Sequence, residues 1–150
     1  DPGLISKLQD LARPGIKLVL AGAQVPAGNY SRQALKQLDS APGFPPDFDR
    51  RVLANVVSEE ENVRAVAAKV QLREADAGIV YRTDISAGVA PQVRQFDLPA
   101  CCSPIAEYPI VAVKGGQADL AAEFIALVLS PEGQRILTER GFLPPASAVP

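Results

Sequence analysis

Residues 58–81 combine an amphipathic helix with a short apolar strand that ends on a tyrosine. One apolar stripe at helical spacing is formed by Val63, Val66, Ala67 and Val70. Ser58 and Glu61 have the spacing of a capping box, which predicts that this helix begins directly after Ser58. The apolar run 77–81 then predicts a short buried strand. A helix that leads at once into a buried strand is typical of α/β proteins.

The same alternation of strand and helix patterns continues along the chain. Apolar runs predict further strands at 16–21, 51–57, 93–98 and 108–113. Apolar periodicity and helix-start residues predict further helices at 3–12, 25–38, 118–129 and 131–140. Segments rich in proline and glycine separate these elements. The pattern predicts an α/β fold with a largely parallel sheet.

The composition limits the chemistry that the chain can perform. It contains no histidine, which excludes triads with a histidine base, and a metal site is not expected without spaced ligands. The net charge of −2 gives no basic field for nucleic acid, and no apolar run is long enough for a membrane span. Cys101 and Cys102 could form a strained disulfide or stay reduced, and the simplest interpretation is two small apolar residues in a loop.

A second landmark is the segment Val25–Gly28, at the start of a predicted helix. With the helix after Ser58 it places two helix N-termini near strand ends, and Tyr81 adds a phenol. Helix N-termini present free N–H groups to anions. The arrangement suits the binding of a small oxyanion by neutral dipoles. Taken singly, the features also fit an ordinary helix start, a core valine and a half-buried tyrosine.

In this order, the landmarks resemble the periplasmic molybdate-binding proteins of ABC importers. The matching segments are Val25–Gly28, Glu61–Arg64, Glu74–Tyr81, Tyr108–Ile110 and Ser130–Phe142. The resemblance extends over nearly the whole chain except residues 39–50 and 86–106. It implies the type II periplasmic binding-protein fold, in which two α/β lobes close over a ligand in the cleft between them.

The resemblance also implies a division of this chain between the two lobes. Residues 23–107 would form the complete lobe II, while residues 1–22 and 108–150 would be the C-terminal part of lobe I. The family carries roughly another lobe's worth of chain before the point that matches Asp1. The chain is therefore expected to correspond to the C-terminal half of the family.

Three residues carry over as ligand contacts for the oxyanion. The resemblance assigns backbone N–H donors to Ala27 and Val63 and a hydroxyl donor to Tyr81, and it places two serine-like contacts in the part of the family that precedes this chain. No residue is expected to be catalytic. The glutamates beside Val63 would repel an anion, so they must point away from the cleft.

The ligand implied is molybdate or tungstate, preferred over the smaller sulfate because cavity size sets the hydrogen-bond distances. The partners implied are the membrane subunits of an ABC importer, and the location is periplasmic or otherwise extracytoplasmic. Alternatives are a binder of another anion such as sulfate, a ligand-sensing effector domain of a regulator with the same fold, and a thiol-redox enzyme that uses Cys101 and Cys102.

The apolar faces of residues 16–21, 108–113 and 118–129 would lack part of their cover if the chain stood alone. Exposed patches of that kind are often buried by association, so a homo-oligomer is expected. Binding of molybdate by these residues alone is expected to be weak or absent, because the lobe I donors are not among them.

Overall fold

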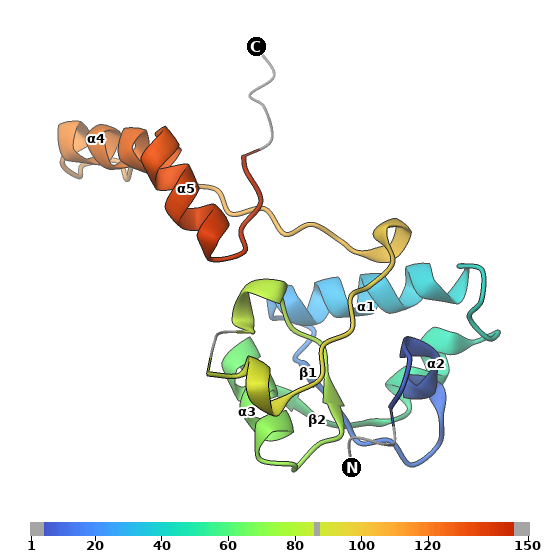
Figure 1. Cartoon of the computed structure of the whole chain (residues 1–150). Helices are drawn as coiled ribbons and strands as arrows, with labels where there is room; N and C mark the ends of the chain where they lie inside the picture. The colour runs from blue at the N-terminus through green and yellow to red at the C-terminus, as the bar shows by residue number, and fades with distance from the viewer. Residues whose placement is uncertain (1–4, 86–87, 146–150) are drawn as a thin grey trace. The chain divides into compact units, whose positions relative to one another are not determined.

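The computed structural model of this chain describes residues 5–85 and 88–145. They form two compact units, which divide between Ala106 and Glu107 (Figure 1). The strands and α-helices of the first unit are β1 (Leu18–Ala21), α1 (Pro26–Asp39), α2 (Phe48–Leu53), β2 (Val56–Glu60), α3 (Val63–Gln71) and β3 (Ala77–Gly78). Its 3₁₀ turns are η1 (Leu8–Ala12), η2 (Arg82–Asp84), η3 (Ala90–Gln92) and η4 (Ala100–Cys102). The second unit contains α4 (Ala118–Leu129) and α5 (Pro131–Glu139).

A parallel sheet with the order β2-β1-β3 lies at the centre of the first unit. All four residues of β1 are buried, as expected for a central strand covered on both faces. Leu18 and Leu20 face one hydrophobic cluster, while Val19 and Ala21 face another, because successive side chains point to opposite sides of a strand. The α/β fold with a parallel sheet is therefore confirmed.

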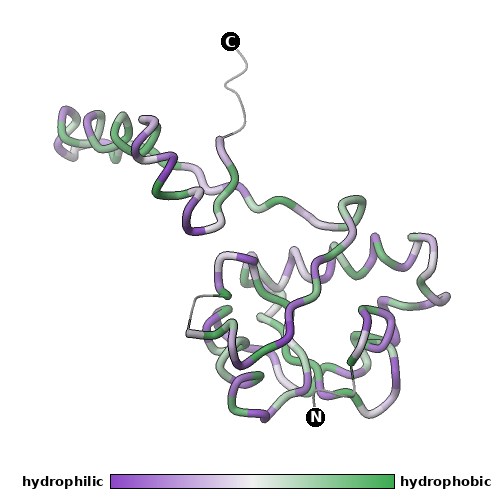
Figure 2. Tube along the Cα trace, viewed as in Figure 1, coloured by the Kyte–Doolittle hydropathy of each residue, from purple (hydrophilic) through white to green (hydrophobic). Residues whose placement is uncertain are grey.

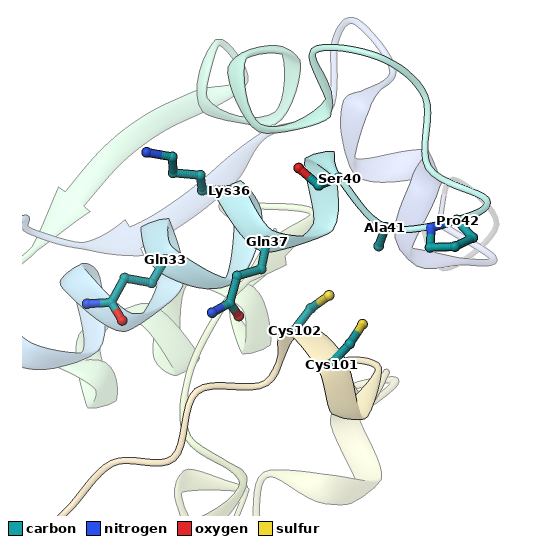
Figure 3. A pocket seen from close by; sticks show the side chains of 8 residues that line it. All are labelled: Gln33, Lys36, Gln37, Ser40, Ala41, Pro42, Cys101 and Cys102. Carbon is teal, nitrogen blue, oxygen red and sulfur yellow. The ribbon is translucent and has the colours of Figure 1, made fainter.

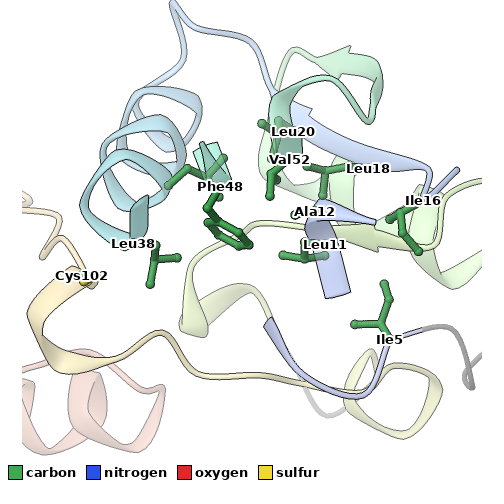
Figure 4. Packing of buried hydrophobic residues seen from close by; sticks show 11 residues of the cluster. Ile5, Leu11, Ala12, Ile16, Leu18, Leu20, Leu38, Phe48, Val52 and Cys102 are labelled. Atoms are coloured by element: carbon green, nitrogen blue, oxygen red, sulfur yellow. The ribbon is translucent and has the colours of Figure 1, made fainter. Parts of the chain in front are cut away.

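Helices cover both faces of this sheet. The cluster around Leu18 and Leu20 receives side chains from α1 and α2, with Phe48 and Val52 fully buried (Figure 4). The opposite cluster receives Val66 from α3. Figure 2 shows hydrophobic and hydrophilic residues alternating along the helices. In the described ranges, no helix has both the length and the apolar character needed to cross a bilayer.

Several predicted elements are confirmed and others are wrong. The strand at 16–21 and the helices at 25–38, 118–129 and 131–140 are present with small shifts at their ends. The predicted strand 51–57 is wrong, because α2 ends at Leu53 and β2 begins only at Val56. The two fully buried residues of α2, Phe48 and Val52, are four positions apart, which brings both to the core from a helix.

Three further predictions are corrected. The helix expected at 3–12 is the shorter 3₁₀ turn η1, and residues 3–4 lie outside the described residues. Residues 93–98 contain no strand, although Phe96 and Leu98 pack against the core. Residues 108–113 also contain no strand, and Val111 and Val113 are 77% and 78% exposed. A strand needs a neighbour to hydrogen-bond, and this apolar run pairs with none in the part of the chain that the structure describes.

The division of the chain between two lobes was expected to group residues 1–22 with 108–150. Residues 5–106 form one compact unit, because β1 is buried and hydrogen-bonded to a strand on each side. Residues 1–4 and 146–150 lie outside the described ranges. The assignment of the chain to two lobes of a larger clamshell stays a prediction.

The second unit is a helical hairpin with an exposed apolar surface. Ser130 caps α5, since its side chain accepts a hydrogen bond from Gly133 N–H at 3.1 Å. The chain leaves α5 at Gly141, whose φ of 86° suits the predicted glycine stop. Large exposed apolar side chains on the hairpin are Leu120, Phe124, Leu127, Leu129 and Ile136.

This exposed surface motivates the prediction that residues 1–150 expressed alone associate into oligomers. The expected result is a mass above that of a monomer in size-exclusion chromatography with light scattering, rising with protein concentration. Phe124→Ser, which makes an exposed position of α4 polar, should shift the profile toward the monomer. A strictly monomeric profile at high concentration would contradict the prediction.

Candidate oxyanion-binding site

The carboxyl ends of the parallel strands bring together the three residues assigned to the ligand. At this edge β1 leads into α1, β2 leads into α3, and the chain from β3 reaches Tyr81. Ala27, Val63 and Tyr81 pack in one hydrophobic cluster that also includes Val19 and Ala21 of β1. Ligands of open α/β sheets bind outside the carboxyl ends of the strands. The sheet therefore places all three residues where such a ligand would lie.

The N-terminus of α1 has backbone donors that the helix itself cannot use. Val25 is the N-cap residue and supplies no side-chain cap. Pro26 has no N–H group, and the Asn29 N–H donates to the Val25 carbonyl at 3.1 Å. The amides of Ala27 and Gly28 remain as first-turn donors without an acceptor inside the helix. The N–H of Ala27 is thus accompanied by a second donor that the sequence did not indicate.

Gly28 lets this helix end approach the sheet closely. A Cβ atom at this position would lie 2.0 Å from the Gly22 carbonyl oxygen and 2.3 Å from that of Ala21. The turn it faces is held in place, because Gly22 N–H donates to Glu60 O at 2.8 Å and Val25 N–H donates to Gly22 O at 2.9 Å. Only glycine fits here, and the amides of the first turn are fixed relative to the end of β1.

The N-terminus of α3 has the same kind of donors. Asn62 is its N-cap, and the Asn62 side chain accepts a hydrogen bond from Ala65 N–H at 3.0 Å. Val66 N–H donates to the Asn62 carbonyl at 3.4 Å. Val63 and Arg64 occupy the first two helical positions, so their N–H groups have no acceptor inside the helix. Two helix N-termini therefore each present a pair of amides at this edge.

The predicted capping box of Ser58 and Glu61 is wrong. Ser58 lies inside β2, and Ser58 Oγ contacts the Glu60 carboxylate and accepts a hydrogen bond from Lys69 Nζ at 2.8 Å. The strand extends to Glu60 because β1 offers a partner as far as Ala21. Asn62, directly before the apolar stripe, is itself a favoured N-cap residue. That signal was available in the sequence.

Removal of the Asn62 cap gives a prediction about stability. Asn62→Ala should lower the free energy of unfolding by about 1 kcal/mol, because the Ala65 N–H loses its acceptor. Urea denaturation followed by circular dichroism measures the change. Asn62→Ser should retain most of the stability, and Asn29→Ala, an exposed asparagine inside α1, is the control. An equal loss for the serine and alanine variants would show that the cap is not the cause.

The strand expected at 77–81 is shorter, because β3 ends at Gly78. Tyr81 therefore follows the strand and packs against α1. Its ring lies edge-to-face on Tyr30, with centroids 6.3 Å apart, and it lines a cavity of about 420 Å³ beside β3. The Tyr81 N–H donates to Asp84 Oδ2 at 2.9 Å, which fixes the backbone at this point. Burial raises the pKa of Asp84, and the Tyr81 hydrogen bond and the charge of Arg64 offset this only in part.

Acidic side chains near the donors are paired with cations from the flanking helices. Glu59 Oε1 lies 2.5 Å from Arg32 Nη2 of α1, and Glu60 Oε1 lies 2.6 Å from Lys69 Nζ of α3. The hydrogen bond from Lys69 is the largest of the effects that lower the pKa of Glu60. Glu61 is exposed. The resemblance implies that the glutamates beside Val63 must not repel the anion. In the structure, Arg32 and Lys69 neutralise the charges of Glu59 and Glu60.

The two cysteines lie away from these donors, beside the C-terminal half of α1. They line an open hollow together with Gln33, Lys36, Gln37, Ser40, Ala41 and Pro42 (Figure 3). Both thiols are free, Cys101 exposed and Cys102 packed in the core. The contact with Cys101 and the burial of Cys102 raise the pKa of Cys102 to about 11, so the Cys102 thiol stays protonated at neutral pH. The thiol-redox alternative gains no support. The described residues also form no cluster of His, Cys, Asp or Glu suited to a metal ion.

Comparison with known proteins places the chain in a family. Residues 1–143 match the profile described as bacterial extracellular solute-binding protein. The molybdate-binding protein ModA of Mycobacterium tuberculosis H37Rv is 34% identical over 146 residues, which are 97% of this chain and 51% of that protein. ModA of Haemophilus influenzae is 31% identical over 121 residues, with 80% and 43% covered. ModA of Escherichia coli is 30% identical over 118 residues, with 79% and 42% covered.

No significant match was found among solved structures. The chain spans about half the length of the curated relatives it matches. Its parallel α/β sheet agrees with the type II periplasmic binding-protein fold, of which it is a part. With the family profile matched from residue 1 to residue 143, the chain belongs to the bacterial extracellular solute-binding proteins.

Proposed function

We propose that this chain supplies half of the binding site for molybdate or tungstate in a periplasmic solute-binding protein, which delivers the anion to the membrane subunits of an ABC importer. One observation carries the proposal: Ala27, Val63 and Tyr81, which come from three separate segments, pack in one cluster at the carboxyl edge of the sheet. The curated relatives lend support, since those compared above are named molybdate-binding proteins.

The chemistry of the donors suits a tetrahedral dianion. Hydrogen bonds from N–H and O–H groups to a charged acceptor contribute roughly 1.5–3 kcal/mol each. The first-turn amides of Ala27 and Val63 provide such donors, and Tyr81 provides a hydroxyl. Because these donors are neutral, they would hold the anion without a buried counter-charge. Two further contacts would come from lobe I, and closure of the lobes would complete the site.

The test is isothermal titration calorimetry of oxyanions with the full-length protein that contains this chain. Molybdate and tungstate are expected to bind at least about tenfold more tightly than sulfate, a difference of about 1.4 kcal/mol or more. Residues 1–150 alone are the matched comparison and should bind weakly or not at all. Equal affinity for sulfate would contradict the selectivity, and the absence of binding by any of these oxyanions would contradict the function.

A further inference from the structure

The Arg32 guanidinium joins three segments beside the α1 donors. Arg32 Nη1 donates to Gly28 O at 3.0 Å and to Ala21 O at 3.2 Å, and Arg32 Nη2 donates to Glu59 Oε1 at 2.5 Å. These acceptors lie in the first turn of α1, at the end of β1 and in β2. The side chain is only 26% exposed, although it carries a full charge. One planar group therefore connects a proposed anion-binding helix end to β1 and to β2.

The contacts of Arg32 show which backbone groups of the first turn it uses. Carbonyl groups of an α-helix point toward its C-terminus and N–H groups toward its N-terminus. Because Arg32 donates to the carbonyl groups of Gly28 and Ala21, it does not occupy the amides of Ala27 and Gly28. Arg32 would therefore act on an anion through these amides and through Glu59, and not as a direct ligand.

The negative charge of Glu59 explains why a cation is needed at the position of Arg32. The Glu59 side chain is 49% exposed and projects from β2, the strand that leads to the amides of Val63 and Arg64. An unpaired carboxylate here would repel a dianion at the carboxyl edge. Arg32, on α1, neutralises the charge of Glu59. In the same way Lys69, on α3, neutralises the charge of Glu60, with Lys69 Nζ 2.6 Å from Glu60 Oε1. Each helix that presents free amides thus carries the cation that neutralises a neighbouring glutamate.

We propose that Arg32 is a positioning residue of the oxyanion site, which cancels the charge of Glu59 and holds the first turn of α1 against the end of β1. This inference rests on the proposed function. An ion pair whose carboxylate is about half exposed contributes little to stability, so the main effect should be on anion affinity. Lysine could supply the charge but not the forked contacts to Gly28, Ala21 and Glu59.

The experiment measures molybdate affinity in the full-length protein by calorimetry at low and high salt. Arg32→Gln should weaken binding about tenfold at low salt, and the loss should shrink at high salt as the exposed Glu59 charge is screened. Glu59→Gln should bind no more weakly than the wild type. The double variant should recover only part of the lost affinity, because the repelling charge is gone while the contacts to Gly28 and Ala21 are still missing. Arg32→Lys should fall between the wild type and Arg32→Gln.

Arg50→Gln is the matched control, since Arg50 also pairs with a carboxylate, that of Asp47, but in α2 and its cap, away from the donors. It should leave the affinity unchanged. If the wild type binds molybdate and Arg32→Gln binds equally well, the role of Arg32 is overturned while the proposed function stands. A loss that is independent of salt and persists in full in the double variant overturns the charge-cancelling role. If the wild type binds no oxyanion, the proposed function is overturned and the role of Arg32 with it.

Discussion

Gly28→Val is expected to destabilise the first unit by about 1–3 kcal/mol and to abolish measurable oxyanion binding. The added side chain would begin 2.0 Å from Gly22 O and 2.3 Å from Ala21 O, and both contacts are with backbone. These backbone atoms cannot yield easily, because Gly22 N–H is bonded to Glu60 O and Val25 N–H to Gly22 O. The start of α1 must therefore move, which carries its free amides away from the end of β1.

Chemical denaturation gives the stability change of Gly28→Val, and calorimetry with molybdate on the full-length protein gives the affinity. Asn29→Ala is the control for a changed side chain one position further along the same helix, where the residue is exposed. It should preserve both quantities. A Gly28→Val protein with the stability and affinity of the wild type would contradict the close packing of α1 on β1 and the role of its amides.

Tyr81→Phe is expected to weaken molybdate binding about 10- to 100-fold. The substitution removes a hydroxyl donor, whereas the ring that packs on Tyr30 at 6.3 Å is retained. The backbone hydrogen bond from position 81 to Asp84 is also retained. The loss of affinity should therefore come from the missing hydroxyl and not from a displaced ring or backbone.

Tyr30→Phe is the matched control, because it removes a hydroxyl from the neighbouring ring of the same aromatic pair. Its affinity for molybdate should remain within about threefold of the wild type. Calorimetry on the full-length protein measures both variants. Retained affinity in Tyr81→Phe would remove Tyr81 from the site, and a loss confined to Tyr30→Phe would assign the donor to Tyr30.

Local signals in the sequence were sufficient to predict elements that are defined by residues close together in the chain. α1 begins at Pro26 after an extended Val25, and α5 begins at Pro131 after the Ser130 cap, as the proline and serine positions predict. The buried strand β1 was identified by its continuous apolar run. In these cases the residues that define the element lie within one turn or one strand of each other.

Features that depend on distant partners were not predictable in the same way. The run 108–113 has strand-like composition, but a strand forms only beside another strand, and its sequence cannot specify one. Ser58 has a capping spacing, yet pairing with β1 made it part of β2. α2 is only six residues long, so its buried pair, Phe48 and Val52, gave little periodicity to recognise.

The candidate site also combines residues that could be identified from the sequence with contacts that only the fold determines. Ala27, Val63 and Tyr81 were identified through a family resemblance, and their meeting at one edge depends on the parallel order of three strands. The contacts of Arg32 could be anticipated only in part. Its spacing of four residues from Gly28 is visible along α1, whereas its pairing with Glu59, 27 residues away, requires the fold.

The position of the bound anion tests the central claim most directly. Anomalous diffraction at the molybdenum edge, from crystals of the full-length protein with molybdate, locates the metal without reference to the protein. The expected peak lies at the carboxyl edge of β1, β2 and β3, with anion oxygens about 2.7–3.2 Å from Ala27 N, Val63 N and Tyr81 Oη. A molybdenum peak elsewhere, with these three donors out of hydrogen-bonding reach, would contradict the account.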